Sequence, residues 1–472
     1  MSRRPFSLAH RESYLRFSSL ALPRYTSYPA IPHWKDQLTL AAKGSELAAA
    51  LEVGQAYSLY LHVPYCAKLC FYCGCQKEIM NPKSAAAQQK VEAFIQGLRD
   101  ELALVAPAFQ KAVLRHIHVG GGTPNFLNPE QWLQVKALIV AQLPTAPDLE
   151  WSVEVDPRTI TEAHLETFAQ LGVKRLSLGV QDFEDKVQKA INRIQPFSMV
   201  ADLCQKARAL GMNALNFDLI YGLPFQTRES IEGTLEKVLA LRPDRIAYYR
   251  LAILPDLFAA QKNFAPEDLP QGKASMELNL LIQRRLQDAG YESIGLDHFA
   301  LPEDALAIAA RAGTLQRNFQ GMTTGRDLPL LGLGPSAISS MGAVSVQNPK
   351  TTEAWLEALQ QSETQLKAHH LTREDRLRKA IIDQIFCRSA IDVKELEQEF
   401  GEALIALFQE VLPDLRILEA EGLVSFDRHK CIRLTEPLGR LLQRVVASLF
   451  DAYLPRGAYL NGLEVGRASS VG

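Results

Sequence analysis

Short runs of β-forming residues alternate with amphipathic helical segments from about Tyr57 to Tyr249. This alternation is typical of βαβ units that build a parallel sheet. Polar residues follow nearly every strand, which favours a βα barrel or an open barrel sector over a doubly wound sheet, with a simple open sheet as the alternative. Six strands are predicted, at Ser58–Val63, Leu114–Val119, Trp151–Val155, Arg175–Val180, Ala214–Ile220 and Arg245–Tyr249.

Changes in the pattern divide the chain into three parts. Residues 1–56 precede the first strand and contain the segment Pro23–Pro29, whose prolines oppose a helix, so we expect an arm that packs on the barrel. Residues 57–370 are assigned to the barrel and its elaboration. Residues 371–472 are mostly helical and charged, with a winged-helix-like hairpin expected around Gly422–Leu434. The predicted fold class is therefore α/β, a parallel and partial barrel with a small helical C-terminal domain.

Three cysteines follow the first predicted strand with the spacing C-x3-C-x2-C, namely Cys66, Cys70 and Cys73. Thiolates suit zinc or iron–sulfur clusters, and three of them can hold three irons of a cubane while the fourth iron stays open for chemistry. A structural zinc site normally needs four ligands, which Cys75 or His62 would have to complete. Inert buried thiols are the third interpretation.

Further polar groups are expected at the same edge of the sheet. A glycine run, Gly120–Pro124, follows the second strand, where it either brings backbone N–H groups close to a ligand or forms a tight structural turn. Glu154, Gln181, Arg193 and Asp218 stand at or soon after the ends of the next strands. Each could be a solvated or ion-paired side chain. Together they indicate a small zwitterionic ligand with hydroxyl groups.

Charge and cysteine content exclude several classes of protein. The 51 Lys and Arg residues nearly balance 53 Asp and Glu residues, for a net charge of −2, so a nucleic-acid partner is not expected. The longest uncharged run, Leu328–Pro349, contains several prolines and glycines and is interpreted as buried strands and turns rather than a membrane span. The N-terminus has no signal-peptide hydrophobic region, and the clustered cysteines fit a reducing compartment, so we expect a cytoplasmic protein.

The cysteine motif, the glycine run and the later acidic and amide residues together resemble the radical S-adenosylmethionine superfamily. More specific segments resemble the oxygen-independent coproporphyrinogen III oxidase (dehydrogenase) family, over about residues 20 to 455. These segments are Pro23–Pro29, Tyr60–Cys75, Gly120–Pro124, Glu154–Arg158, Ser177–Phe183, Asp218–Pro224, Asp297–Ala300, Arg317–Gly321 and Ser336–Ser339.

The resemblance implies a [4Fe–4S] cluster on Cys66, Cys70 and Cys73, with Cys75 unligated. The open iron would take the amino and carboxylate groups of S-adenosylmethionine, and two such molecules would lie side by side. The residues implied to contact S-adenosylmethionine are Tyr60, Tyr72, Gly121, Gly122, Thr123, Glu154, Gln181, Arg193, Asp218, Ala252 and Ile338.

The resemblance also implies the reaction. The reduced cluster, supplied by an electron-donor protein, would cleave S-adenosylmethionine to a 5′-deoxyadenosyl radical that removes hydrogen from a propionate side chain. Loss of carbon dioxide and one electron would leave a vinyl group, twice per molecule, which converts coproporphyrinogen III to protoporphyrinogen IX. Arg24, His298 and Arg317 are the candidate partners of the tetracarboxylate substrate, because guanidinium and imidazolium groups suit carboxylates.

Several positions depart from the family pattern. Ile253 replaces a polar ring, Met322 stands where tyrosine is common, Leu22 replaces a glycine, and the segment 386–390 is less familiar. Two alternatives therefore stay open: a radical enzyme acting on another tetrapyrrole, and a haem-binding carrier of the same superfamily. The Cys73-Gly74-Cys75 ending counts against the carrier.

Overall fold

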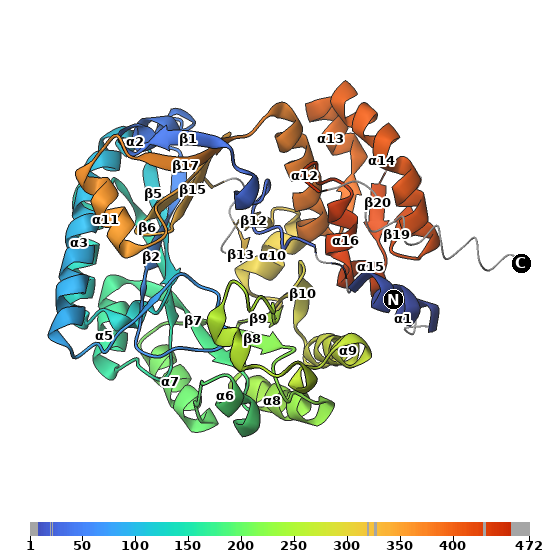
Figure 1. Cartoon of the computed structure of the whole chain (residues 1–472), viewed down its shortest axis with the longest axis horizontal. Helices are drawn as coiled ribbons and strands as arrows, with labels where there is room; N and C mark the ends of the chain where they lie inside the picture. Colours follow the sequence, from blue (N-terminus) through green and yellow to red (C-terminus); the bar gives the residue numbers. More distant parts are fainter. Residues whose placement is uncertain are drawn as a thin grey trace, which may run out of the picture.

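The computed structural model describes residues 8–18, 20, 22–318, 321–324, 328–427 and 431–454 (Figure 1). Its centre is a sheet of 13 strands. Six neighbouring strands in this sheet run parallel and contain all six predicted segments, which confirms the predicted alternation. They are β2 (Ala56–Val63), β5 (Val113–Gly121), β6 (Thr145–Val155), β7 (Val173–Gln181), β8 (Ala214–Tyr221) and β9 (Arg245–Arg250).

The sheet continues beyond this parallel run on both sides. β14 (Leu330–Leu333) lies parallel to β2, and β15 (Ile338–Met341) and β16 (Val344–Gln347) follow it as antiparallel strands, so the uncharged run does form buried strands and turns. Beyond them lie β17 (Gln365–His370) and β1 (Asp36–Thr39). On the opposite side, β11 (His298–Ala300) and β10 (Glu292–Ile294) extend β9. No pairing between β1 and β10 is present in the described part of the chain, so the barrel is open.

Helices that connect the parallel strands cover the outer side of the sheet, as α3, α5, α7 and α8 show (Figure 1). Several begin with hydrogen-bonded caps; Asn128, Thr161 and Thr227 each form a capping box, which satisfies otherwise unpaired N–H groups. The helices that follow β2 to β8 are α3 (Ala85–Val105), α4 (Pro129–Gln142), α5 (Glu162–Leu171), α6 (Asp185–Ala190), α7 (Phe197–Ala209) and α8 (Arg228–Leu241).

A buried ion pair fixes the helices next to β14. Lys43, in α2 (Leu40–Ala49), lies 2.6 Å from Glu101 in α3, and both side chains are almost fully buried. Lys43 also donates to Asn348 Oδ1 and the Gly332 carbonyl, while Trp355, in α11 (Thr352–Gln360), donates to the second oxygen of Glu101. The network therefore connects three helices to the sheet. The charged atoms of Lys43 and Glu101 are all hydrogen-bonded within it.

The C-terminal part forms a separate, mostly helical unit around a three-stranded antiparallel sheet ordered β18-β20-β19. Its hairpin matches the predicted one, although residues 428–430 lie outside the described residues. The elements are α12 (Arg373–Arg388), β18 (Ala390–Asp392), α13 (Val393–Phe400), α14 (Glu402–Ala420), β19 (Val424–Phe426), β20 (Cys431–Leu434), α15 (Leu438–Leu441) and α16 (Gln443–Ser448).

The N-terminal segment packs against both the barrel and this C-terminal unit. α1 (Leu8–Ser18) contacts α9 (Gly272–Asp288) and α15. Tyr14, Phe17 and Tyr28 belong to one apolar core with residues of α12 to α16. The hydroxyl of Tyr28 accepts a hydrogen bond from the Ala452 N–H at 3.1 Å. Residues 36–49, which precede β2, carry β1 and α2 and so belong to the central sheet and its covering layer.

Candidate active site

The cysteine loop lies at the carboxyl end of β2. Cys66 ends the short strand β3 (Tyr65–Cys66), which pairs with β4 (Glu78–Ile79) and closes the loop. Cys66 and Cys70 are buried, Cys73 is half-buried and Cys75 is exposed. Cys70 and Cys73 lie close enough to act electrostatically on Cys66, and Cys75 is hydrogen-bonded to Cys73 within reach of Glu154.

Two arginines approach the sulfur of Cys70. Arg158 Nη2 lies 3.2 Å and Arg193 Nη1 lies 3.4 Å from Cys70 Sγ. Cys66 Sγ shares a 3.2 Å hydrogen bond with the hydroxyl of Thr123. Guanidinium groups next to sulfur stabilise the thiolate form, which is the form that binds metal.

The thiols have different pKa values because their surroundings differ. Burial raises the pKa of Cys66 to about 12. The pKa of Cys73 is lowered to about 6, first by a hydrogen bond from Cys75 and then by the charge of Lys77, whose Nζ donates to the Cys73 carbonyl. Cys75 keeps its proton, because the neighbouring Cys73 thiolate raises the pKa of Cys75.

The donor set fits a [4Fe–4S] cluster. Three thiols come from one short loop, two of them are buried, and positive charge surrounds Cys70, which suits an anionic thiolate-bound cluster. Among the described side chains, no three His, Cys, Asp or Glu residues converge on a single metal position. A cubane cluster instead places its cysteine ligands on separate irons.

The glycine run is required for close packing. A Cβ at Gly120 would lie 2.6 Å from Glu154 Oε1, one at Gly121 would lie 2.6 Å from the His62 ring, and one at Gly122 would lie 2.7 Å from the Tyr65 carbonyl oxygen. The N–H groups of Gly122 and Thr123 donate to the carbonyls of Val63 and Tyr65. These two amides are therefore already engaged, as in the structural-turn interpretation.

A polar network connects the ends of β2, β5 and β6. Glu154 Oε1 lies 3.1 Å from His118 Nε2, and His118 Nδ1 lies 2.7 Å from the Ser152 hydroxyl. The Tyr60 hydroxyl lies 3.1 Å from His62 Nδ1. The rings of Tyr60 and His118 stack at 6.0 Å, so the two predicted site residues Tyr60 and Glu154 lie on either side of His118.

Asp156 organises the arginines near Cys70. Its carboxylate accepts from Arg158 at 2.6 Å and from Arg193 at 3.3 Å. Burial would raise the pKa of Asp156, but the two guanidinium charges outweigh it and lower that pKa to about 2. Arg193 Nη2 also donates to the Gly179 carbonyl at 2.5 Å, beside a bulge in β7 where Gln181 adopts φ +68°. Arg193 and Gln181 are thus held at one strand end.

Asp218 lies in the middle of β8 and is half-buried among polar side chains. Ser177 donates to it at 2.7 Å and Asn216 donates at 3.0 Å. Burial, reinforced by the charge of Glu154, raises the pKa of Asp218 to about 6. The charge of Glu154 acts on Asp218, so these two predicted site residues face a common space.

Gln261 connects the remaining predicted contacts. Its side-chain amide donates to the Tyr72 carbonyl at 3.2 Å and to the Ala252 carbonyl at 2.9 Å, which holds the cysteine loop against the segment after β9. Ile338 begins β15 and is buried, and its carbonyl oxygen would lie 2.5 Å from a Cβ at Gly332. Ile338 therefore approaches the site from the β14 side of the sheet.

A cavity of about 770 Å³ opens beside Ala252, between β9, the N-terminal segment and α16. Arg24 and Arg317 line it, as do Leu22 and Ile253, two positions that depart from the family pattern. His298 lies just behind the wall; its ring nitrogens contact Asp297 at 2.8 Å and the Tyr249 hydroxyl at 3.4 Å. Met322 does not line the cavity; it is buried in the apolar core that also holds Tyr14, Phe17 and Tyr28, and it pairs with Arg317 across two short strands.

Four polar residues of the site were not predicted as functional: Arg158, Ser177, Asn216 and Gln261; Asp156 was counted among the polar groups at strand ends but given no role. Asp156 and Arg158 directly follow a predicted strand, so their position was a usable signal. Ser177 and Asn216 lie inside strands, and their side chains face the site because residues alternate across a strand. Gln261 belongs to an irregular segment whose sequence carries no such signal.

Two family models match the chain. The model described as "Radical SAM superfamily" matches residues 60–238, which include the cysteine loop and β2 to β8. The model described as "HemN C-terminal domain" matches residues 371–442, which include α12 to β20.

The similar proteins agree with these models. The chain is 39% identical over 437 residues to the oxygen-independent coproporphyrinogen III oxidase of Salmonella typhimurium, covering 92% of this chain and 94% of that protein. It is 39% identical to the enzyme of the same name from Bradyrhizobium diazoefficiens, covering 94% and 97%. The solved structure of coproporphyrinogen III oxidase (HemN) from Escherichia coli, described as a radical SAM enzyme, superposes with a TM-score of 0.85 at 37% identity, covering 91% and 98%. The chain therefore belongs to the oxygen-independent coproporphyrinogen III oxidase family of the radical S-adenosylmethionine superfamily.

Proposed function

We propose that this protein decarboxylates two propionate side chains of coproporphyrinogen III to vinyl groups without oxygen, giving protoporphyrinogen IX. The observation that carries the proposal is the arrangement of the cysteine loop at the carboxyl end of β2, with Arg158 and Arg193 at Cys70, beside an arginine-lined cavity. Together these two features provide a cluster site and a space for an anionic macrocycle. The relatives named for this reaction share nearly the whole chain.

Cys66, Cys70 and Cys73 would ligate the cluster, and Cys75 would remain a thiol. When bound, the cluster and S-adenosylmethionine supply the one-electron chemistry that removes hydrogen from a propionate. The protein's own contribution is to position these groups and to exclude water.

The strand-end residues would hold S-adenosylmethionine. Arg193 can form a forked contact with its carboxylate, and Glu154 and Asp218 can accept hydrogen bonds from its ammonium or ribose hydroxyls. Tyr60, Gly121, Gly122, Thr123 and Gln181 would surround one molecule. A second S-adenosylmethionine molecule would contact three further residues. These are Tyr72 in the cysteine loop, Ala252 in the segment after β9, and Ile338 in β15.

The substrate would enter the cavity beside Ala252. Arg24 and Arg317 line that cavity and would bind propionate carboxylates. His298, held between Asp297 and Tyr249, would act from the cavity wall. Its contacts with Asp297 and Tyr249 fix the orientation of the ring.

The proposal includes an electron-donor protein for the cluster and a cytoplasmic location. All seven cysteines are free thiols, and a reducing compartment preserves such thiols. Within the described residues, none of the helices has the length and apolar character that a membrane crossing requires.

The test is an anaerobic assay of the iron–sulfur-reconstituted protein with reductant, S-adenosylmethionine and coproporphyrinogen III, with products separated by chromatography. We expect protoporphyrinogen IX and 5′-deoxyadenosine to appear together. If 5′-deoxyadenosine forms while the porphyrinogen is unchanged, the substrate assignment is wrong and another tetrapyrrole is indicated, since Leu22 and Ile253 line the cavity. If haem binds tightly and no 5′-deoxyadenosine forms, the protein is a carrier.

A further inference from the structure

The cavity beside Ala252 concentrates unpaired positive charge. Its charged lining consists of four arginines, Arg24, Arg250, Arg317 and Arg444, and one carboxylate, Asp297. In the described part of the chain, none of these arginines has a carboxylate within ion-pair distance; Asp297 is bonded to His298, and its charge reaches Arg317 and Arg24 only from beyond that distance. Such an excess stands out in a chain whose net charge is −2.

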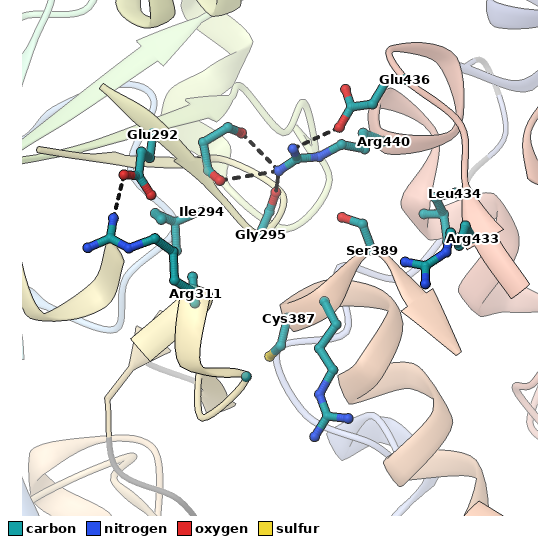
Figure 2. A pocket seen from close by; sticks show the side chains of 14 residues that line it. Glu292, Ile294, Gly295, Arg311, Cys387, Ser389, Arg433, Leu434, Glu436 and Arg440 are labelled. Carbon is teal, nitrogen blue, oxygen red and sulfur yellow. Dashed lines mark hydrogen bonds and ion pairs between the residues drawn. The ribbon is translucent and has the colours of Figure 1, made fainter. Parts of the chain in front are cut away.

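In a second cavity, by contrast, the lining arginines are paired with carboxylates (Figure 2). This cavity, of about 540 Å³, lies between β10, α10 (Ala305–Ala312) and the C-terminal unit. There Arg311 is paired with Glu292, and Arg440 is paired with Glu436 at 2.9 Å. The remaining lining arginines, Arg388 and Arg433, pair with carboxylates next to the cavity. The arginines of the first cavity lack this neutralisation.

The unpaired arginines are instead held by backbone carbonyls. Arg24 donates to the carbonyl of Arg250 at 2.8 Å, and Arg444 donates to the carbonyl of Leu22 at 3.2 Å. Arg250 donates to Ser18 at 3.4 Å, and Arg317 donates to Arg24 at 3.2 Å while its Nη1 is buried without a partner. Each guanidinium has five N–H donors, so these single bonds orient the groups and leave donors for a ligand.

The cavity has two chemically distinct ends. Tyr249 contacts the His298 ring and lies within electrostatic reach of Asp218 and Glu154, whereas Arg250, the next residue of β9, donates to the Ser18 carbonyl of the N-terminal segment. Arg250 is in register with Tyr221, and both act electrostatically on Arg444 of α16, together with Arg24. One end therefore adjoins the proposed S-adenosylmethionine site, and the other gathers three like charges from three parts of the chain.

Arg250 and Arg444 are half-buried and Arg24 is exposed, and like charges brought together in this way repel one another unless an anion neutralises them. We propose that Arg24, Arg250 and Arg444 form a clamp for the two carboxylates of the tetrapyrrole that the reaction leaves in place. The inference rests on the proposed function, and it adds Arg250 and Arg444 as specificity-determining residues. The C-terminal unit thereby completes the substrate site through α16.

The test measures porphyrin binding to the reconstituted protein by fluorescence titration. The probes are coproporphyrin III, a tetracarboxylate; protoporphyrin IX, a dicarboxylate that keeps only the two retained groups; and the uncharged tetramethyl ester of coproporphyrin III. Arg444→Gln and Arg250→Gln should each weaken binding of both acids about ten- to a hundredfold, as expected for a lost charge-assisted hydrogen bond. The ester should bind weakly to every protein, and Arg444→Lys should recover part of the affinity.

The matched control is Arg416→Gln. Arg416 lies on α14 in the same unit, is paired with Glu419, and is 57% exposed, so its variant should bind all probes like the parent protein. In turnover, the KM for coproporphyrinogen III should rise in the clamp variants, while iron content and substrate-free formation of 5′-deoxyadenosine stay unchanged. Arg250 lies in the barrel and Arg444 lies in α16. If one of the two variants fails to fold, the other can still be measured.

Two results would overturn the clamp. Unchanged affinity in both variants would exclude it, and a loss confined to the tetracarboxylate would mean that these arginines bind a propionate that is removed. These results differ from failure of the proposed function, in which the parent protein binds both acids but does not decarboxylate coproporphyrinogen III.

Discussion

Asp156 is the residue that connects the most parts of the site. It bonds both Arg158 and Arg193, and each of these arginines reaches Cys70. Neither arginine touches another carboxylate at these distances in the described residues, so the position of both depends on Asp156.

Replacing Asp156 by Asn should therefore displace Arg193 without removing it. We expect the KM for S-adenosylmethionine to rise about tenfold or more, the effect of losing one charge-assisted contact, while the cluster still forms. Kinetics of 5′-deoxyadenosine formation and iron content give the two readouts. Asp148→Asn, at an exposed position of β6, the strand that Asp156 follows, is the control and should change neither; loss of iron in Asp156→Asn would show that the arginines serve the cluster instead.

The cysteines make a second residue-scale prediction. Cys70→Ser should abolish iron binding and cleavage of S-adenosylmethionine together, because Cys70 is buried beside both arginines. Cys75→Ser should retain iron, since Cys75 is exposed and keeps its proton beside the Cys73 thiolate. Iron and sulfide analysis after anaerobic reconstitution checks both, and iron loss in the Cys75 variant would mean that the ligand set is wrong.

Asp218 predicts a pH dependence. Burial raises its pKa to about 6, so in the ligand-free protein the carboxylate is charged above pH 6 and becomes protonated as the pH falls. Protonation removes the negative charge that attracts an ammonium group and weakens the hydrogen bond accepted from a ribose hydroxyl, so affinity for S-adenosylmethionine should fall up to about tenfold per pH unit below that point. Anaerobic equilibrium dialysis between pH 5 and 8 measures this slope. Asp218→Asn should bind weakly with a flat profile, and a persisting slope would assign the titration to another group.

At the scale of elements, the sequence predicted the strands whose positions follow from the local pattern of apolar and polar residues. All six parallel strands and the site residues at their ends follow from alternation and from the rule that such ends share one edge. The flanking strands β10, β11 and β14 to β17 were not individually predicted, because each has six residues or fewer and its pairing depends on distant partners. Gln261 was missed for the same reason: its role depends on bringing Tyr72 and Ala252 together.

For the Lys43–Glu101 pair, we predict how much burial of an ion pair affects the free energy of unfolding when one partner is removed. Lys43→Met would leave Glu101 buried without its cation, which should lower the free energy of unfolding by about 3–5 kcal/mol. Lys90→Met is a matched control, because Lys90 also lies 2.6 Å from a glutamate, Glu78, but is 45% exposed. That change should cost about 0–1 kcal/mol. Denaturant unfolding compares the two, and equal losses would contradict the role of burial.

At the scale of the whole molecule, the arm and the C-terminal unit share one apolar core that is separate from the barrel core. Tyr28 contributes to it with a buried ring and with its bond to Ala452. The cavity wall formed by Leu22, Arg24 and α16 depends on this core, because the same two segments form both.

Tyr28→Ala should thus loosen the cavity wall and leave the cysteine loop intact. Truncating a buried aromatic ring typically costs about 3–5 kcal/mol, so we expect faster amide hydrogen exchange in α16 and a higher KM for the tetrapyrrole. Iron content should not change. Tyr28→Phe keeps the ring and should have a small effect; if the alanine variant instead loses iron, the two cores are not independent.

The open sheet has a consequence for how such an enzyme can diversify. A closed eight-stranded barrel fills its centre with its own side chains, whereas this arc leaves its missing wall to be supplied by the arm and α16. The proposed substrate contacts on the arm and α16 therefore lie on pieces of chain separate from the cysteine loop, whereas Arg250 belongs to β9 of the barrel. Leu22 and Ile253, two departures from the family pattern, fall on that wall and not on the cysteine loop. Selection can in this way alter which macrocycle is accepted while the inherited chemistry stays constant.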